Sequence, residues 1–146
     1  MKKLLLLAAI VAIPFLQSCD KEDDKLIGVN DLPAKAQELI STYFAGIEIS
    51  YAKVDKDLFE KTYEVLFADG SKVEFEKDGD WKEVSCRYTK VPDGIIPQPI
   101  TDYVSTNHSS LYAVEIDRDK HGYEVKMNNG MELKFNKDYG FIGFDS

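Results

Sequence analysis

One short pattern occurs twice in this chain, sixty residues apart, and it constrains the fold more than any other feature. The first copy is Tyr63-Glu64-Val65 with Gly70, Val73, Phe75 and Asp78, and the second is Tyr123-Glu124-Val125 with Gly130, Leu133, Phe135 and Asp138. Chance matching of common residues rarely produces so long a correspondence. The repeat therefore predicts one supersecondary unit that is used twice.

The N-terminus has the pattern of an export signal. Lys2 and Lys3 form a basic start, and the apolar run 4–13 is too short to span a membrane. Leu16-Gln17-Ser18-Cys19 follows and resembles the lipobox of bacterial lipoproteins. This resemblance implies cleavage before Cys19 and acylation of Cys19. The alternative is an ordinary secretory signal that happens to end in a cysteine.

A lipobox also implies a cellular location. We expect a lipoprotein of the Gram-negative cell envelope, anchored to the outer membrane. Segment 20–25 is charged throughout, so residues 19–31 are expected to form an acidic, solvated tether. Acidic residues directly after a lipidated cysteine also resemble a signal for display on the outer surface.

The net charge excludes several partners. The chain has a formal charge of −8 at pH 7, and removal of Lys2 and Lys3 makes it more acidic. Nucleic acid and anionic head groups repel such a chain, so acyl chains alone are expected to hold it at the membrane. Cys86 is then the only thiol left, and we expect a buried structural residue without a disulfide.

The predicted fold class is α+β, with two tandem α-β4 units. Asp31 and Pro33 begin a helix whose apolar residues include Ala36 and Ile40, and Gly46 ends it. The predicted divisions are a signal peptide 1–18, the tether 19–31, unit one 32–90, a joint 91–95 and unit two 96–146. The predicted strands are 47–54, 62–67, 72–77 and 81–88 in unit one, and 111–116, 123–127, 132–137 and 141–144 in unit two, after a helix that begins at Ile96-Pro97.

Polarity predicts the register of one hairpin in each unit. A three-residue loop ending in a left-handed Gly70 pairs Val65 with Val73 and Tyr63 with Phe75. The loop ending in Gly130 pairs Val125 with Leu133 and Tyr123 with Phe135 in the same way. These apolar pairs form a face that packs on the helices, and the alternate charged residues form an open, wet face.

The side of the sheet that Trp81 occupies depends on the next turn. A two-residue Asp78-Gly79 turn places Trp81 on the open face opposite Glu76, and it similarly places Phe141 opposite Asn136. A longer turn instead makes Trp81 part of the core. We favour the open face, because the longer turn points Glu83 inward.

The repeated motif resembles that of the PepSY-like, β-lactamase-inhibitor-like lipoproteins over roughly residues 32–146. The resemblance implies two α-β4 units whose sheets join into one concave surface backed by helices. β-Lactamase inhibitor protein shares this layout and clamps an enzyme with its concave face. This chain lacks the disulfides of that inhibitor.

Catalytic and metal-binding motifs are absent from the sequence. His108 and His121 have no metal-like spacing to another ligand, and a Cys86/His121 pair is the one dyad that sequence alone leaves open. The Asp-x-Asp pairs fall in predicted turns, where Asp side chains accept hydrogen bonds from the backbone. A calcium loop needs more oxygen ligands at set spacing than these pairs supply. These pairs are Asp55/Asp57, Asp78/Asp80 and Asp117/Asp119. We expect no enzyme activity, no cofactor and no metal.

The function that these features favour is binding. We expect the open face of the sheet to engage an envelope or extracellular protein or peptide, with a basic surface favoured by the acidic residues. The candidate residues are Trp81, Phe141, Glu64, Glu74, Glu76 and Glu83. The alternative is a small-ligand or sensory role, with a cleft between the units near residues 92–99.

Overall fold

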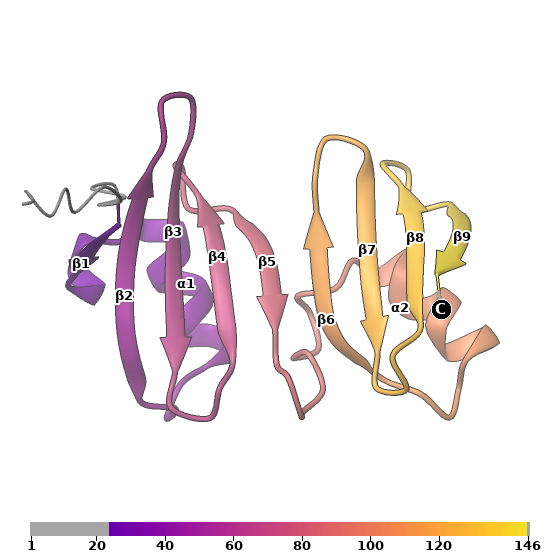
Figure 1. The fold of residues 1–146 in the computed structure, drawn as a ribbon. Helices are drawn as coiled ribbons and strands as arrows, with labels where there is room; N and C mark the ends of the chain where they lie inside the picture. The colour runs from indigo at the N-terminus through magenta and orange to yellow at the C-terminus, as the bar shows by residue number, and fades with distance from the viewer. Residues whose placement is uncertain (1–23, 146) are drawn as a thin grey trace, which may run out of the picture.

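The computed structural model describes residues 24–145, which form one antiparallel sheet with two α-helices on one side (Figure 1). Nine strands lie in chain order, and each pairs with the next. The strands are β1 (Lys25–Ile27), β2 (Ile49–Lys56), β3 (Lys61–Phe67), β4 (Lys72–Glu76), β5 (Trp81–Ser85), β6 (Ala113–Arg118), β7 (Gly122–Met127), β8 (Glu132–Asn136) and β9 (Phe141–Asp145). The helices are α1 (Ala34–Tyr43) and α2 (Gln98–Asn107), and a 3-10 turn spans Val29–Asp31.

The predicted fold class of two tandem α-β4 units is wrong. Within residues 24–145 the protein is a single nine-stranded sheet with only two α-helices, because β5 pairs with β6 and hydrogen bonding continues across the middle. The edge strand β1 was also missed: Lys25–Ile27 pairs with Ala52–Val54, although we placed these residues in the tether. The charged run ends at Lys25, and the apolar Leu26 and Ile27 after it continue the pairing at the edge of the sheet.

The predicted hairpin registers are confirmed. Val65 pairs with Val73 and Tyr63 with Phe75, and a left-handed Gly70 closes the loop. The second hairpin repeats the pattern, with Val125 opposite Leu133 and Tyr123 opposite Phe135. A one-residue slip would have placed these apolar side chains in water, which is why polarity was sufficient to predict the register.

The core lies between the sheet and the two helices. From α1, Ala36 and Ile40 are buried, and Phe44 at the end of the helix stacks on Phe67 with 4.6 Å between ring centroids. From α2, Ile100 is fully buried. The helices cover one face only, so every second residue of the central strands stays on the opposite, open face (Figure 1).

Among the described residues, no helix is long and apolar enough to cross a membrane.

Candidate binding face

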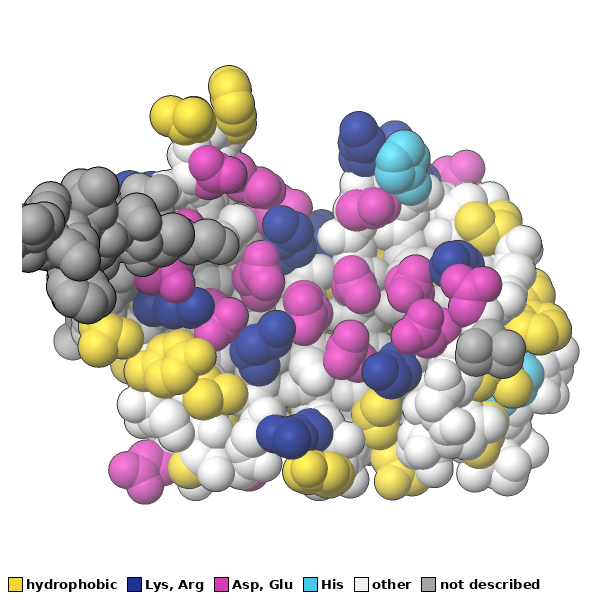
Figure 2. Space-filling model, in the orientation of Figure 1, with side chains coloured by type: hydrophobic (Ala, Val, Ile, Leu, Met, Phe, Trp, Pro, Cys, Tyr) yellow, Lys and Arg dark blue, Asp and Glu magenta, His cyan; other side chains and the backbone are white. Residues whose placement is uncertain are grey.

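Five carboxylates lie side by side across the open face of the sheet. Each is the direct cross-strand neighbour of the next. We call this set the carboxylate row: Glu64 on β3, Glu74 on β4, Glu83 on β5, Asp117 on β6 and Glu124 on β7. Lys53 on β2 and Lys134 on β8 are the next neighbours at its two ends. Figure 2 shows acidic side chains gathered over the middle of this face.

The row follows from strict alternation along the strands. Phe75 and Val73 flank Glu74 and are fully buried beneath the helices, so Glu74 points to the other side. Like charges that face each other across strands destabilise a sheet. Alignment of several such pairs is therefore a feature that fold stability alone does not favour.

Lysines neutralise most of the row. Lys72 lies 2.9 Å from Glu83, Lys53 lies 3.6 Å from Glu64, Lys82 lies 3.6 Å from Glu74, and Lys134 lies 3.9 Å from Glu124. The Tyr51 hydroxyl also donates to Glu64 at 2.7 Å. The side chains of Glu64, Glu74 and Glu83 remain 20%, 23% and 25% exposed beside these lysines.

Asp117, the fourth member of the row, differs from the other members. Among residues 24–145, no lysine or arginine forms an ion pair with its carboxylate. Burial, and then the charges of Glu83, Glu124 and Glu115, raise the pKa of Asp117 from 3.8 to about 6. Burial and the neighbouring Glu132 also raise the pKa of Glu124. The row therefore has unsatisfied negative potential at Asp117.

A hollow lies beside the row. It has a volume of about 220 Å³ and is lined by Asp117, Glu124 and Lys134 from the strands and by His121 from the β6–β7 turn. A surface that is acidic and indented can accept a protruding cationic side chain.

Trp81 is not on this face, and the position that we favoured is wrong. A three-residue loop closes the β4–β5 hairpin, with the Glu76 amide donating to the Asp80 carbonyl, so Trp81 pairs with buried Phe75. The longer-turn alternative is confirmed. Lys82 is the extra residue of a bulge, and the bulge returns Glu83 to the open face opposite Glu74. The bulge therefore removes the objection that Glu83 would point inward.

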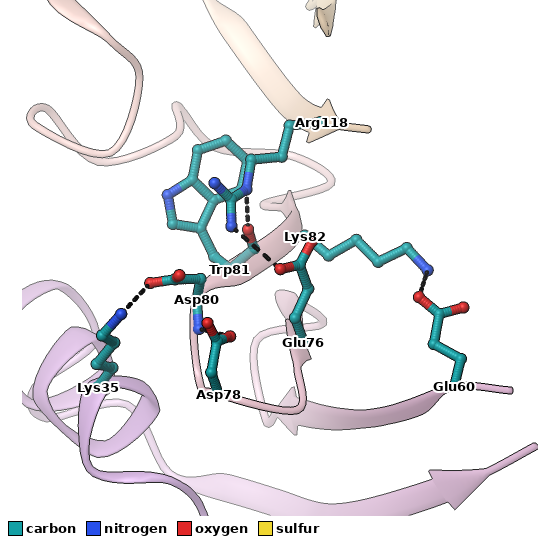
Figure 3. A network of polar contacts seen from close by, with 8 residues as sticks. All are labelled: Lys35, Glu60, Glu76, Asp78, Asp80, Trp81, Lys82 and Arg118. Carbon is teal, nitrogen blue, oxygen red and sulfur yellow. Dashed lines mark hydrogen bonds and ion pairs between the residues drawn. The ribbon is translucent and has the colours of Figure 1, made fainter. Parts of the chain in front are cut away.

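Trp81 is instead partly buried at the junction of the two halves of the sheet. The Arg118 guanidinium lies over its ring at 5.1 Å, and Arg118 Nε donates to the Trp81 carbonyl (Figure 3). Its ring centroid is 6.5 Å from that of Tyr123. Arg118 also lies 3.7 Å from Glu76, so Glu76 belongs to this junction and not to the row.

Phe141 is misplaced by the same error. It pairs with Phe135, not Asn136, and stacks on Tyr103 of α2 with 4.7 Å between ring centroids. Both aromatic members of the predicted binding face thus pack on the helix side. Of the predicted face, Glu64, Glu74 and Glu83 remain in the carboxylate row, and the sequence analysis missed Asp117 and Glu124 as members. Their alternation with buried Ile116 and Val125 was the available signal.

One turn gathers a second acidic cluster. Single carboxylate oxygens of Glu76, Asp78 and Asp80 lie within 4.8 Å of one another. Asp78 acts as predicted for a turn residue, because its carboxylate accepts the Asp80 amide at 3.2 Å. Lys35 of α1 pairs with Asp80 at 3.0 Å (Figure 3).

A separate hollow of about 320 Å³ lies on the helix side, near the predicted cleft. Its lining includes Val91 and Asp93 after β5, Val104 on α2, Leu111 before β6 and Ala113 at the start of β6. Its volume is at the low end for small-molecule sites. The small-ligand alternative remains a prediction.

The other residues with reactive side chains have structural surroundings. Cys86 is buried, as predicted, and burial raises the pKa of its thiol, which disfavours the reactive thiolate. His108 caps the end of α2 through its backbone amide, and His121 lies in the β6–β7 turn. Cys19 lies outside the described residues.

Comparison with known proteins identifies the family. The sequence profile described as "Putative beta-lactamase-inhibitor-like, PepSY-like" matches residues 61–143. The chain belongs to this PepSY-like family. The resemblance inferred from the repeated motif is therefore confirmed, and an inhibitor-like family points to a non-catalytic module. No curated protein matches the chain.

Solved structures from Bacteroides are close to this PepSY-like chain. A Bacteroides vulgatus protein, described as "a putative periplasmic protein from DUF2874 family", is 44% identical, with a TM-score of 0.83 over 86% of this chain and 99% of that chain. A Bacteroides thetaiotaomicron protein, described as "a putative calcium-regulated periplasmic protein", is 44% identical, with a TM-score of 0.83 over 86% and 98%. A second B. vulgatus periplasmic protein of unknown function is 37% identical, with a TM-score of 0.80 over 84% and 99%. These names agree with an envelope location.

Proposed function

We propose that this PepSY-like protein is a non-catalytic binding module of the cell envelope, and that the open face of its sheet binds a basic segment of another protein or peptide. The carboxylate row carries this proposal. Four of the five aligned carboxylates are paired with lysines, and Asp117 has no ion pair among the described residues. A cationic partner would gain from the negative potential that remains at Asp117 and would relieve the like-charge contacts along the row.

The geometry favours a flat, extended partner. The row crosses β3 to β7, and neighbouring strands lie roughly 4.8 Å apart. Successive side chains on one side of an extended peptide repeat at roughly 6.6 Å. Lysine or arginine side chains are long enough to bridge that mismatch. Such binding is expected to weaken as salt rises, because exposed charges are screened.

The test uses an oligolysine peptide as the probe, with calorimetry at low salt. The row variant Glu74→Gln/Glu83→Gln/Asp117→Asn is expected to lose most of the affinity. The matched control Glu38→Gln/Asp102→Asn/Asp138→Asn removes the same number of charges at exposed sites outside the row. This control is expected to keep most of the affinity for the peptide. Equal losses of affinity in the two variants would mean that binding depends only on net charge, and would reject the open face as the binding site.

We propose that the module is attached to the envelope through acylated Cys19. Support comes from the lipobox pattern 16–19 and from relatives that are named as periplasmic. Labelling of cells with a fatty-acid probe is expected to mark the wild-type chain and not Cys19→Ala. A Cys19→Ala chain that remains fully membrane-bound would contradict the anchor. Protease treatment of intact cells tests display on the outer surface.

Calcium binding is a second candidate. The specific observations are the gathered carboxylates of Glu76, Asp78 and Asp80 and the relative described as calcium-regulated. Lys35 and Arg118 already pair with this cluster, so an ion would compete with them and bind weakly. Calcium sites of extracellular modules often have Kd values of about 10⁻⁴–10⁻³ M.

Thermal unfolding with and without calcium tests this candidate. The wild type is expected to gain Tm in millimolar calcium, and Asp78→Asn/Asp80→Asn is expected to lose that gain. Asp102→Asn/Asp138→Asn serves as the control and is expected to respond like the wild type. An unchanged wild-type Tm would exclude calcium as a ligand at these concentrations.

A further inference from the structure

The tip of the β2–β3 hairpin exposes two large apolar side chains next to each other. Leu58 is 89% exposed and Phe59 is 96% exposed, which makes them the most exposed large hydrophobic residues of the described chain. Figure 2 shows apolar side chains at the tip of this projecting hairpin. Adjacent large apolar residues at full exposure are costly in water and typically mark a contact with another apolar phase.

The tip is an ordered turn. The Asp57 amide donates to the Glu60 carbonyl at 2.8 Å, and the Asp57 carboxylate accepts the Leu58 amide at 2.6 Å. Glu60 forms an ion pair with Lys82 at 3.5 Å. These contacts hold the turn in one conformation, with Leu58 and Phe59 presented outward at its tip.

Sheet topology places the chain's entry at the same end. Strand β1 is antiparallel to β2, and Lys25 pairs with Val54, only four residues before Leu58. The chain before Lys25 therefore joins the sheet at the end where the hairpin projects (Figure 1). An anchor upstream of Lys25 would therefore be tethered to the tip end of the sheet.

Chain lengths make contact with a membrane feasible. Lys25 follows Cys19 by six positions in the sequence, which gives a reach of at most about 22 Å. From Val54 the chain continues four residues to Leu58, two in β2 and two in the turn, and so extends at most about 13 Å beyond Lys25 in the direction of the tip. The segment after Cys19 is thus long enough for the tip to meet the bilayer that holds Cys19, and short enough to keep it close.

We propose that Leu58 and Phe59 insert into the bilayer interface as a second, non-covalent membrane contact. Their location beside a membrane rests on the proposed anchor at Cys19. Exposed Lys56, next to the tip, is placed to reach lipid phosphates. With two contacts at one end, the strands stand up from the bilayer and the carboxylate row faces sideways into solvent, accessible to a partner. Acyl chains alone, as expected from the charge of the sequence, would leave this orientation free.

The test imposes the anchor chemically. Residues 24–145 contain the whole described core, so a chain that begins at Cys19 retains it. Cys86 is buried, so Cys19 can be coupled to a maleimide lipid in phosphatidylcholine vesicles whose acyl chains carry bromine. Bromine quenches tryptophan fluorescence inside the bilayer. The Phe59→Trp variant has one tryptophan more than the wild type, and we expect bromine to quench most of the fluorescence of that added tryptophan.

Ile142→Trp is the matched control, since Ile142 is 63% exposed on β9 at the opposite edge of the sheet. Its emission is expected to be unchanged by bromine. Equal quenching in Phe59→Trp and Ile142→Trp, or none in either, would overturn the proposal. Because the coupling is chemical, this result does not depend on acylation in cells, which the Cys19→Ala labelling tests separately.

Discussion

The two faces of the sheet are built from alternate residues of the same strands and differ in the side chains that they present. On the helix-covered face, Val65, Val73, Val84, Ile116 and Val125 are fully buried in one continuous band. On the open face, their chain neighbours form the carboxylate row, in which like charges stand opposite each other. The covered face is a continuous apolar core, whereas the open face brings like charges together, with lysine partners for every member of the row except Asp117.

Truncation on the two faces is expected to give the largest contrast. Phe75→Ala removes a fully buried ring and is expected to lower the free energy of unfolding by about 3–5 kcal/mol. Glu74→Ala, one residue earlier on the open face, is expected to change it by about 0.5 kcal/mol. Urea unfolding measures both free energies. Similar losses of stability in the two variants would contradict the difference between the faces.

Trp81 is expected to have an intermediate effect. It is partly buried, and its contacts are Arg118 and Tyr123, so Trp81→Ala is expected to cost about 2 kcal/mol, less than a fully buried ring. Since it is the only tryptophan, fluorescence reports on it directly. Blue-shifted emission with weak acrylamide quenching is expected, whereas solvent-like emission would return Trp81 to the open face.

Asp117 is expected to make stability fall as pH rises. Its pKa is raised to about 6 in the folded protein, so the fold binds this proton more tightly than the unfolded chain does, and stability is lost between about pH 4 and pH 6. The full shift corresponds to about 3 kcal/mol, which solvent screening of a partly exposed group reduces to about 1 kcal/mol.

The Asp117→Asn variant therefore tests the cost of the row. It is expected to be about 1 kcal/mol more stable than the wild type at pH 8 and nearly equal to it at pH 4. Thermal unfolding across this range measures the difference, with Glu38→Gln on α1 as a control that removes an exposed charge on the helix side. A variant that is less stable at pH 8 would show that the row is not under repulsion.

The parts of the fold that follow from apolar alternation could be predicted from the sequence. Pairing of Tyr63 with Phe75 was predictable because a one-residue shift exposes several apolar side chains at once and the Gly70 turn sets the loop length. The face of the sheet on which Trp81 lies was not predictable, because it depends on the loop length and on a bulge at Lys82. The longer loop and the bulge each shift the register by one residue in opposite directions, so together they leave little trace in the polarity pattern. The strand β1 was missed because Lys25 and Leu26 are held mainly by backbone pairing.

The candidate site was only partly predictable for a related reason. Glu64, Glu74 and Glu83 follow from the hairpins, whereas their continuation to Asp117 and Glu124 requires the pairing of β5 with β6. That pairing joins strands separated by the whole of α2, and no local signal in the sequence specifies it. The row therefore becomes visible only in the assembled sheet.

The central claim is that the carboxylate row is the surface that binds a cationic segment. Titration of the isotope-labelled protein with the oligolysine peptide, followed by amide chemical shifts in NMR spectra, tests it most directly. We predict that the largest shifts fall on Glu64, Glu74, Glu83, Asp117, Glu124 and their strand neighbours, and that they disappear in high salt. Shifts that concentrate on α1 and α2, or that spread evenly over the acidic surface, would contradict the claim.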